Sequence, residues 1–261
     1  MTMNGYEKWL FQHKEKSGAA IRLICFHYAA GNAAWFSPWE RYCGNDIELC
    51  AVQLPQRSER ISEKMPDTIE ELAEQFVSDS MELFDRPFVI FGHSMGAMVA
   101  YETAFRLKEK YGISPELLVL SACGAPLYPE IQFTGRSILN ADDDDIKDIL
   151  DDYGQTDEEL LGSQEFCEYY FPIVRSDFHV CEIYCKKPVS ALDCSISVLR
   201  GNRDERVTAE EAALWGRYTS ADCTVRNFTG GHFFPQEHIH EIIEIIRSKI
   251  NNSEVKYFGQ Q

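Results

Sequence analysis

Short apolar segments alternate along the chain with longer segments in which apolar residues recur every three or four positions. The short segments are rich in β-branched and aromatic residues, which favours strands. The longer ones have the spacing of amphipathic helices. Such alternation is typical of a parallel sheet covered by helices on both faces. We therefore predict a single α/β domain over residues 1–261, with strands at 21–26, 47–54, 88–91, 117–121, 196–199 and 223–228 and an additional edge strand at 9–12.

Local signals mark the starts of three helices. Thr68 is followed three positions later by Glu71, and Thr208 by Glu211, which is the spacing of a capping box. The last helix is predicted to begin near Pro235, because proline is tolerated in the first helical turn.

The alternation breaks over residues 127–188, where no strand is predicted. Acidic residues at 142–145 favour the start of a helix, because carboxylates there meet the positive end of the helix dipole, and Gly154 would end it. The following segment, 165–184, carries more aromatic residues than a surface linker needs. We predict that residues 127–188 form a helical lid subdomain inserted over the carboxyl edge of the sheet.

The sequence Gly92-His93-Ser94-Met95-Gly96 has the G-x-S-x-G pattern of a nucleophile elbow. An apolar strand precedes it, and an amphipathic segment without proline follows it, so strand, turn and helix come in the expected order. Small residues on both sides let the serine stand on a sharp turn. The alternative is that Ser94 is only a small residue in a tight turn between strand and helix.

A serine nucleophile needs a histidine base, and the base needs a carboxylate that orients it. In this type of fold the carboxylate and then the histidine follow the serine along the chain. Asp204 and His232 each come just after a predicted strand, so both should project at the edge of the sheet that carries Ser94. Glu205 is the second choice for the acid, while Asp193 precedes its strand and should lie at the opposite edge.

The other histidines are weaker candidates for the base. His238 and His240 fall in the last predicted helix, and the ring of His93 should point away from the serine hydroxyl. His27 and His179 could line a pocket.

Acyl transfer also needs backbone N–H groups that stabilise the oxyanion. The residue after the nucleophile, Met95, would supply one. The loop at 26–34, which leaves the first strand and is rich in small residues, would supply the other through Ala29.

Six blocks of sequence, in order along the chain, together resemble the type II thioesterases, which are stand-alone α/β-hydrolases associated with nonribosomal peptide and polyketide synthesis. These blocks are Phe26 to Gly31, Gln53 to Arg57 with Arg60, the elbow, Pro172 to Phe178, Gly201 to Asp204 with Val207 and Trp215, and Gly230 to Phe234. The resemblance implies an α/β-hydrolase fold with a helical lid. It also implies hydrolysis of acyl groups from the phosphopantetheine thiol of carrier proteins through an acyl-enzyme intermediate.

By position, the resemblance assigns Ser94 as nucleophile, Asp204 as acid, His232 as base, and Ala29 and Met95 as oxyanion donors. It implies no cofactor other than the phosphopantetheine on the partner.

Two positions depart from the family pattern, which usually has proline and a double glycine where this chain has His27 and Ala30. The loop should therefore be less stiff, and the backbone at Ala30 must suit a residue with a Cβ. We expect His27, Tyr28 and Phe233 to contact the substrate.

Composition restricts the partners and the compartment. The net charge of −17 argues against nucleic acid and anionic membranes as partners. Residues 1–16 lack the apolar core of a signal peptide, so we expect a cytoplasmic, monomeric protein with reduced cysteines. Cys181, Cys185 and His179 lack a fourth ligand, so we predict no metal site.

Two alternatives to the carrier-protein thioesterase stay open, a small-molecule carboxylesterase or lipase and a catalytically idle carrier-binding module. Carrier proteins are generally acidic, so a docking surface should be locally basic. Arg57, Arg60 and Lys64 form one candidate patch, and Lys186 with Lys187 another.

Overall fold

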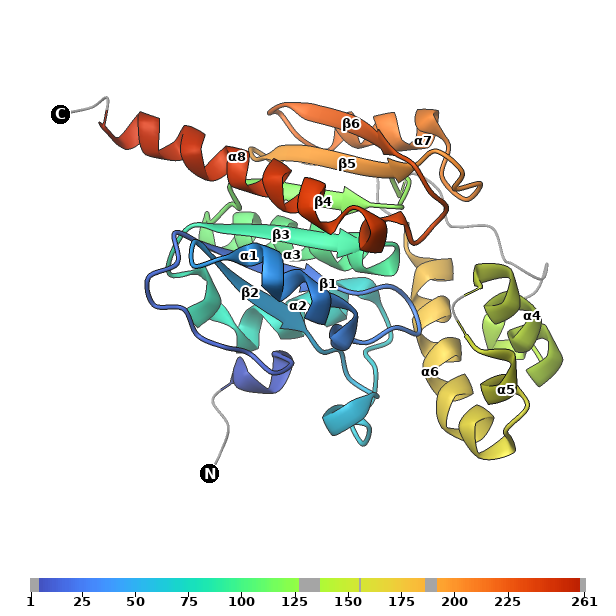
Figure 1. Cartoon of the computed structure of the whole chain (residues 1–261). Helices are drawn as coiled ribbons and strands as arrows, with labels where there is room; N and C mark the ends of the chain where they lie inside the picture. Colours follow the sequence, from blue (N-terminus) through green and yellow to red (C-terminus); the bar gives the residue numbers. More distant parts are fainter. Residues whose placement is uncertain (1–4, 127–136, 155, 186–191, 259–261) are drawn as a thin grey trace.

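The computed structural model describes residues 5–126, 137–154, 156–185 and 192–258, with the side chains of residues 158 and 249–258 left out. Its centre is one six-stranded sheet in the order β2-β1-β3-β4-β5-β6 (Figure 1). Every neighbouring pair of strands is parallel. The strands are β1 Ile21–Phe26, β2 Ile47–Val52, β3 Phe88–His93, β4 Leu117–Ser121, β5 Ser195–Gly201 and β6 Cys223–Phe228.

The six predicted strands are confirmed, with shifted ends. The second stops at Val52 rather than at residue 54, whereas β3 and β5 extend to the carboxyl edge at His93 and Gly201. The predicted edge strand at 9–12 is wrong. This segment makes only an isolated antiparallel bridge between Leu10 and Val52, after the 3-10 turn Glu7–Trp9.

Helices cover both faces of the sheet, as the alternation predicted. Alternate residues of the strands enter two separate apolar clusters, because successive side chains of a strand point to opposite faces. Helices α2, α3 and α7 pack in the first cluster, and α1 and α8 in the second. The helices are α1 Glu40–Cys43, α2 Ile69–Asp79, α3 Met95–Tyr111, α4 Asp143–Tyr153, α5 Glu158–Leu161, α6 Gln164–Ile183, α7 Ala209–Ala213 and α8 Ile239–Phe258.

The capping predictions are confirmed in part. Thr208 and Glu211 form the full reciprocal box at the start of α7. At α2 the Thr68 side chain accepts from Glu71 N–H, but the Glu71 carboxylate accepts from Asp67 N–H instead of closing the box.

The predicted start of the last helix is several residues early. Pro235 lies in a 3-10 turn, Phe234–Glu237, and α8 begins only at Ile239. His238 separates the two, with non-helical backbone angles, and its Nε2 lies 2.8 Å from the carbonyl oxygen of Thr229.

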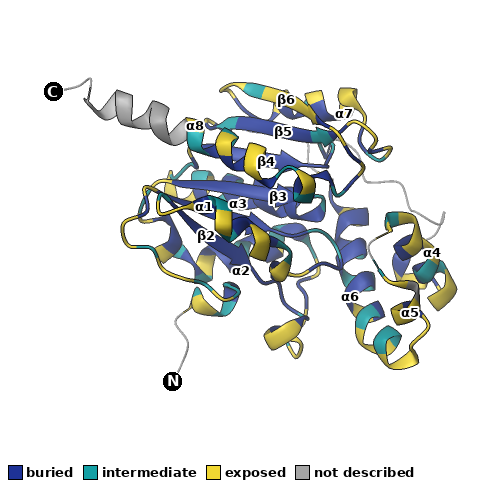
Figure 2. Cartoon of the chain, viewed as in Figure 1, coloured by how far each residue is buried: buried dark blue, intermediate teal, exposed yellow. Residues whose placement is uncertain are grey.

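Helices α4, α5 and α6 lie beside the carboxyl ends of the strands (Figure 1). Asp142 and Asp145 form a capping box at the start of α4, and Gly154 ends it in the left-handed conformation with φ 64°, as expected. The three helices share a small apolar cluster that also includes Ala30 from the loop after β1. The body of the sheet is buried, while the outer faces of α4 and α5 are exposed (Figure 2).

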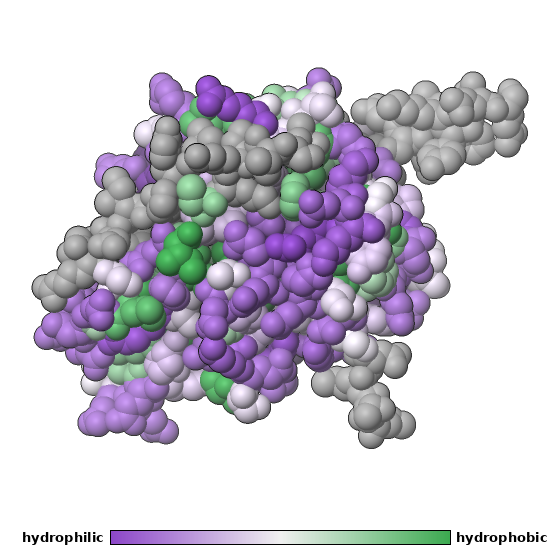
Figure 3. Space-filling view, turned by 180° about the vertical axis from the view of Figure 1, so that it is seen from behind, coloured by the Kyte–Doolittle hydropathy of each residue, from purple (hydrophilic) through white to green (hydrophobic). Residues whose placement is uncertain are grey.

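The face seen in Figure 3 is mostly hydrophilic, with small separate hydrophobic areas. Among the described residues, no helix combines the length and apolar character needed to cross a lipid bilayer.

Candidate active site

Ser94 stands on a strained turn between β3 and α3. Its φ of 54° and ψ of −120° lie outside the regions that non-glycine residues favour, at a typical cost of about 1–3 kcal/mol. Its N–H donates to Ser121 O at 2.8 Å, which anchors the turn to the end of β4. The hydroxyl is therefore presented at the carboxyl edge of the sheet, where open α/β sheets bind ligands.

The two glycines of the pentapeptide are required by close backbone contacts. A Cβ on Gly92 would lie 2.1 Å from Gly96 O, inside the turn itself. A Cβ on Gly96 would lie 2.2 Å from Phe26 O and 2.6 Å from His27 O. The start of α3 thus packs directly on the backbone that leads from β1 into the following loop.

His232 and Asp204 come together from the loops after β6 and β5. The Nδ1 atom of His232 lies 2.9 Å from Asp204 Oδ2, and both side chains are buried. The two loops pack closely, since a Cβ on Gly201 would lie 2.4 Å from Gly231 O. His232 therefore has a fixed orientation, with Nδ1 facing the carboxylate.

The other ring nitrogen of His232, Nε2, is buried and has no hydrogen-bond partner within the described part of the chain. Ser94 and His232 together line two adjoining pockets. The larger has a volume of about 560 Å³ and extends past Met98, Cys123 and Val207. The narrower one runs towards the helices at the carboxyl edge, past Leu150 and Tyr170. The larger pocket therefore has room for an extended substrate, whereas the narrower one has a volume of about 20 Å³, close to that of a single water.

Ala29 lines both pockets and Met95 lines the larger one, so the expected oxyanion donors lie on the walls of the site. Ala29 and Ala30 are the central residues of a turn closed by Gly31 N–H donating to Tyr28 O at 3.1 Å. Ala30 has a φ of 64°, in the left-handed region that glycine adopts easily. The backbone at this position therefore keeps a glycine-like conformation although the residue has a Cβ.

His27 does not line either of the pockets that contain Ser94, so the expectation that it contacts substrate is not supported. Its ring is fully buried, and Nδ1–H donates to Tyr28 O at 2.8 Å. Burial, reinforced by the nearby Arg57 charge, lowers the pKa of His27 to about 3. The neutral ring thus supports the loop from the side away from the pocket.

Tyr28 and Phe233 do line the narrower pocket and contact each other edge to face, with centroids 4.8 Å apart. The sequence reasoning missed Tyr153, which lines both pockets and packs 5.4 Å from the His232 ring. The Arg206 guanidinium stacks on it at 3.9 Å. Nothing in the sequence marks Tyr153, because it comes from the end of α4 and meets the site only through the fold.

The weaker candidates occupy other surroundings. Glu205 is exposed, and Asp193 pairs with Lys108, which leaves Asp204 as the partner of His232. His93 is buried, bonds Ser121 Oγ at 3.0 Å, and lines neither pocket that contains Ser94. His179, His238 and His240 do not line these pockets either.

The predicted basic patch at Arg57, Arg60 and Lys64 is wrong. Arg57 is 2% exposed and Arg60 4%, because Arg57 bonds the buried Asp177 and both guanidinium groups bond backbone carbonyls. Only Lys64 is exposed, and it is paired with Asp67. The second predicted patch, Lys186 and Lys187, lies outside the described residues.

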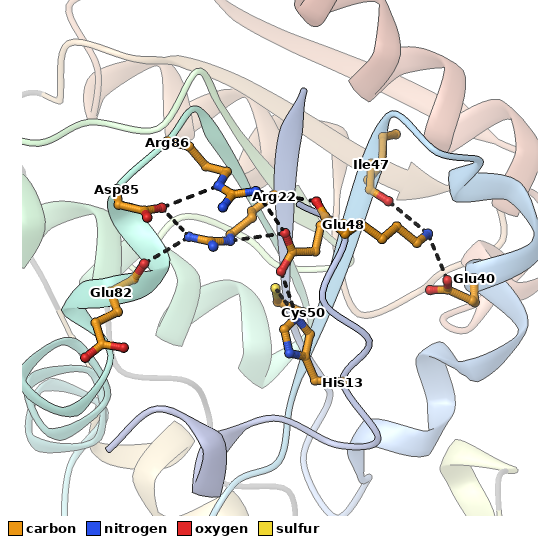
Figure 4. A network of polar contacts seen from close by, with 10 residues as sticks. His13, Arg22, Glu40, Ile47, Glu48, Cys50, Glu82, Asp85 and Arg86 are labelled. Carbon is orange, nitrogen blue, oxygen red and sulfur yellow. Dashed lines mark hydrogen bonds and ion pairs between the residues drawn. The ribbon is translucent and has the colours of Figure 1, made fainter. Parts of the chain in front are cut away.

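One group of residues could offer ligands to a metal among the described parts of the chain, namely His13, Glu48 and Cys50. It lies at the amino-terminal end of β2, away from Ser94, and is shown in Figure 4. The Glu48 carboxylate is already shared with Arg22 and Arg86, at 3.4 Å from each. Two guanidinium groups at the same carboxylate disfavour a divalent cation, so we interpret the group as an ion-pair network.

The α/β-hydrolase class is defined by a parallel sheet, a serine on a strained strand-to-helix turn, and a paired carboxylate and histidine, which here follow β5 and β6. Within this class the chain belongs to the thioesterase family, whose domain profile matches residues 21–250. It is therefore a thioester hydrolase, and the resemblance seen in the sequence is confirmed.

Individual relatives agree with this assignment. The chain is 33% identical to thioesterase PikA5 of Streptomyces venezuelae over 90% of this chain and 82% of that protein. The type II thioesterase BorB from the borrelidin biosynthetic cluster superposes with a TM-score of 0.83 at 32% identity, covering 93% of this chain and 98% of that one.

A third relative carries a name of a different kind. Linear gramicidin dehydrogenase LgrE of Brevibacillus parabrevis is 31% identical over 97% of this chain and 96% of that protein. The loop after β1 of this chain holds a single glycine, Gly31, and lacks the G-x-G-x-x-G pattern of dinucleotide-binding enzymes. The family match and the geometry of the site therefore assign this chain as a thioesterase rather than a dehydrogenase.

Proposed function

We propose that this protein hydrolyses acyl groups from the phosphopantetheine thiol of carrier proteins in nonribosomal peptide or polyketide synthesis. The observation that carries the proposal is the Asp204–His232 bond, which leaves His232 Nε2 unpartnered at a pocket shared with Ser94. The names of relatives such as the type II thioesterase BorB support the choice of substrate.

In the proposed first step, Ser94 Oγ attacks the thioester carbonyl while His232 Nε2 takes the hydroxyl proton. Asp204 holds the imidazole and stabilises its charged form. The N–H groups of Ala29 and Met95 donate to the oxyanion of the tetrahedral intermediate. When the C–S bond breaks, His232 returns the proton to the departing thiol, and Ser94 carries the acyl group.

In the second step His232 takes a proton from water, the resulting hydroxide attacks the acyl-serine, and the proton then passes to Ser94 Oγ. The carboxylic acid leaves and the enzyme is restored without a cofactor of its own. Tyr28 and Phe233 line the narrower pocket beside Ser94, where they would contact the thioester at the serine. Helices α4 to α6 would act as the lid subdomain of a single hydrolase domain, because they lie at the carboxyl edge of the sheet and α4 and α6 line this pocket.

The test is to load a carrier protein with an acetylated phosphopantetheine arm and follow its deacylation by mass spectrometry. Ser94→Ala should lower the rate by about 10⁴-fold or more. Ser114→Ala is the matched control, since Ser114 bonds Asp193 away from the site, and it should retain full activity. Deacylation that persists in Ser94→Ala would overturn the mechanism. Free esters turned over faster than the carrier thioester would favour an esterase instead.

A further inference from the structure

A buried ion pair connects the loop after β2 to helix α6, and both of its members also bond the loop after β1. Arg57 and Asp177 make two parallel hydrogen bonds, Nη1 to Oδ2 at 2.8 Å and Nη2 to Oδ1 at 2.7 Å. Asp177 is fully buried and Arg57 is 2% exposed. A pair of this kind is costly to desolvate, and replacing it by apolar residues often leaves stability unchanged. Stability alone is therefore a poor reason for its presence.

The pair holds the backbone of the turn that contains the proposed oxyanion donor. Ala30 N–H donates to Asp177 Oδ2 at 2.7 Å, and Arg57 Nη1 donates to Gly31 O at 3.0 Å. A third contact from α6, the Tyr170 hydroxyl donating to Ala30 O at 3.0 Å, completes the attachment. Successive backbone groups next to Ala29 are thus each fixed by a side chain.

The turn needs this support because of its conformation. A positive φ at the third residue of a four-residue turn is typical of type II, where glycine is favoured. Ala30 holds that position with a φ of 64°. The alternative type I turn would suit alanine better, and it is reached by flipping the Ala29–Ala30 peptide. Such a flip would remove Ala30 N–H from Asp177 and turn the Ala29 carbonyl towards the carboxylate. Ala29 N–H belongs to the preceding peptide, so it would be displaced through the resulting shift of the turn as a whole.

We propose that Asp177 and Arg57 are positioning residues, which hold the Tyr28–Gly31 turn in the conformation that lets Ala29 N–H bind the oxyanion, and which tie this turn to α6. The inference rests on the proposed function, since it assigns Ala29 as an oxyanion donor. It follows that α6 near Asp177 cannot move away from the sheet without dismantling the oxyanion site.

The first variant is Asp177→Asn, which keeps the size of the side chain but leaves the Arg57 charge without its partner. With an acyl-pantetheine substrate, kcat should fall about tenfold to a hundredfold while KM changes by less than about twofold, because misplacing a donor weakens the transition state alone. A boronic acid that forms a tetrahedral adduct on Ser94 should lose affinity by the same factor. A thioether analogue, which resembles the ground state, should bind unchanged.

The matched control is Glu48→Gln, which removes an equally buried carboxylate from the Arg22 and Arg86 network at the other edge of the sheet (Figure 4). It should lower the melting temperature without changing kcat. If Asp177→Asn folds poorly, the double variant Arg57→Met with Asp177→Leu replaces both charges by apolar groups and should fold while still losing kcat.

Native kcat and boronate affinity in folded variants of Asp177 would overturn the positioning role. Ala30→Gly in the Asp177→Asn background should restore part of the lost kcat, because glycine adopts a positive φ without help. The boronate measurement does not depend on a carrier substrate. A failure of carrier deacylation in the unmodified enzyme would therefore refute the proposed function without deciding the role of Asp177.

Discussion

Replacing Gly96 by alanine should damage catalysis through the oxyanion loop rather than through Ser94. The new Cβ would lie 2.2 Å from Phe26 O. The oxygen is a backbone atom and the Cβ is bonded to the backbone, so no side-chain rotation can relieve the contact. A carbon in contact with a carbonyl oxygen normally stays about 3.3 Å away. The difference means that the start of α3 and the end of β1 must separate by roughly 1 Å.

A displacement of about 1 Å at a catalytic site can cost about a hundredfold in rate. We therefore expect Gly96→Ala to lower kcat about a hundredfold and, through overpacking, the free energy of unfolding by about 1–3 kcal/mol. The assay is thiol release from an acyl-pantetheine, with the melting temperature measured in parallel.

Gly216→Ala is the control, because its Cβ would meet nothing closer than Cys223 Cβ at 3.8 Å. Both variants change the unfolded chain equally, so a difference between them reports the contact with Phe26 and His27. A Gly96→Ala enzyme with native kcat would show that the position of the loop after β1 does not govern catalysis.

Three further predictions concern individual side chains. Asp204→Asn should lower kcat by about three to four orders of magnitude with little change in KM, whereas Glu205→Gln should leave both unchanged. Burial lowers the pKa of His27 to about 3. Below about pH 6.5 the unfolded chain therefore binds a proton at His27, whereas the folded chain does not. Between about pH 6.5 and pH 3, His27 should therefore lower the unfolding free energy by up to about 1.4 kcal/mol for each unit that the pH falls, and urea titrations of His27→Asn should lack this contribution. Tyr153→Ala should join the two pockets and raise kcat/KM for bulkier acyl groups relative to acetyl; an unchanged ratio would contradict its place between them.

Much of the fold follows from local pattern. The strands are short and most are largely apolar, so their limits were predictable to within a few residues. The elbow was recognisable because strand, small-residue turn and helix adjoin. Ser94, Asp204 and His232 could be named from their order after strand ends, since parallel strands deliver their carboxyl ends to one edge of the sheet. The error at residues 9–12 arose because a short apolar segment can as readily form a single bridge as a strand.

The local pattern could not predict which side chains are buried and paired by contacts with distant segments of the chain. Arg57 looked like a surface charge until the fold placed Asp177, 120 residues away, opposite it in the interior. His27 looked like a pocket residue, but its ring is fully buried and lines neither pocket that contains Ser94. Burial and partnership depend on contacts between remote parts of the chain. For that reason the sequence alone determined the reaction class and the order of its chemical groups, while the tertiary structure decided which charged side chains face solvent and which ones hold the loop of the site.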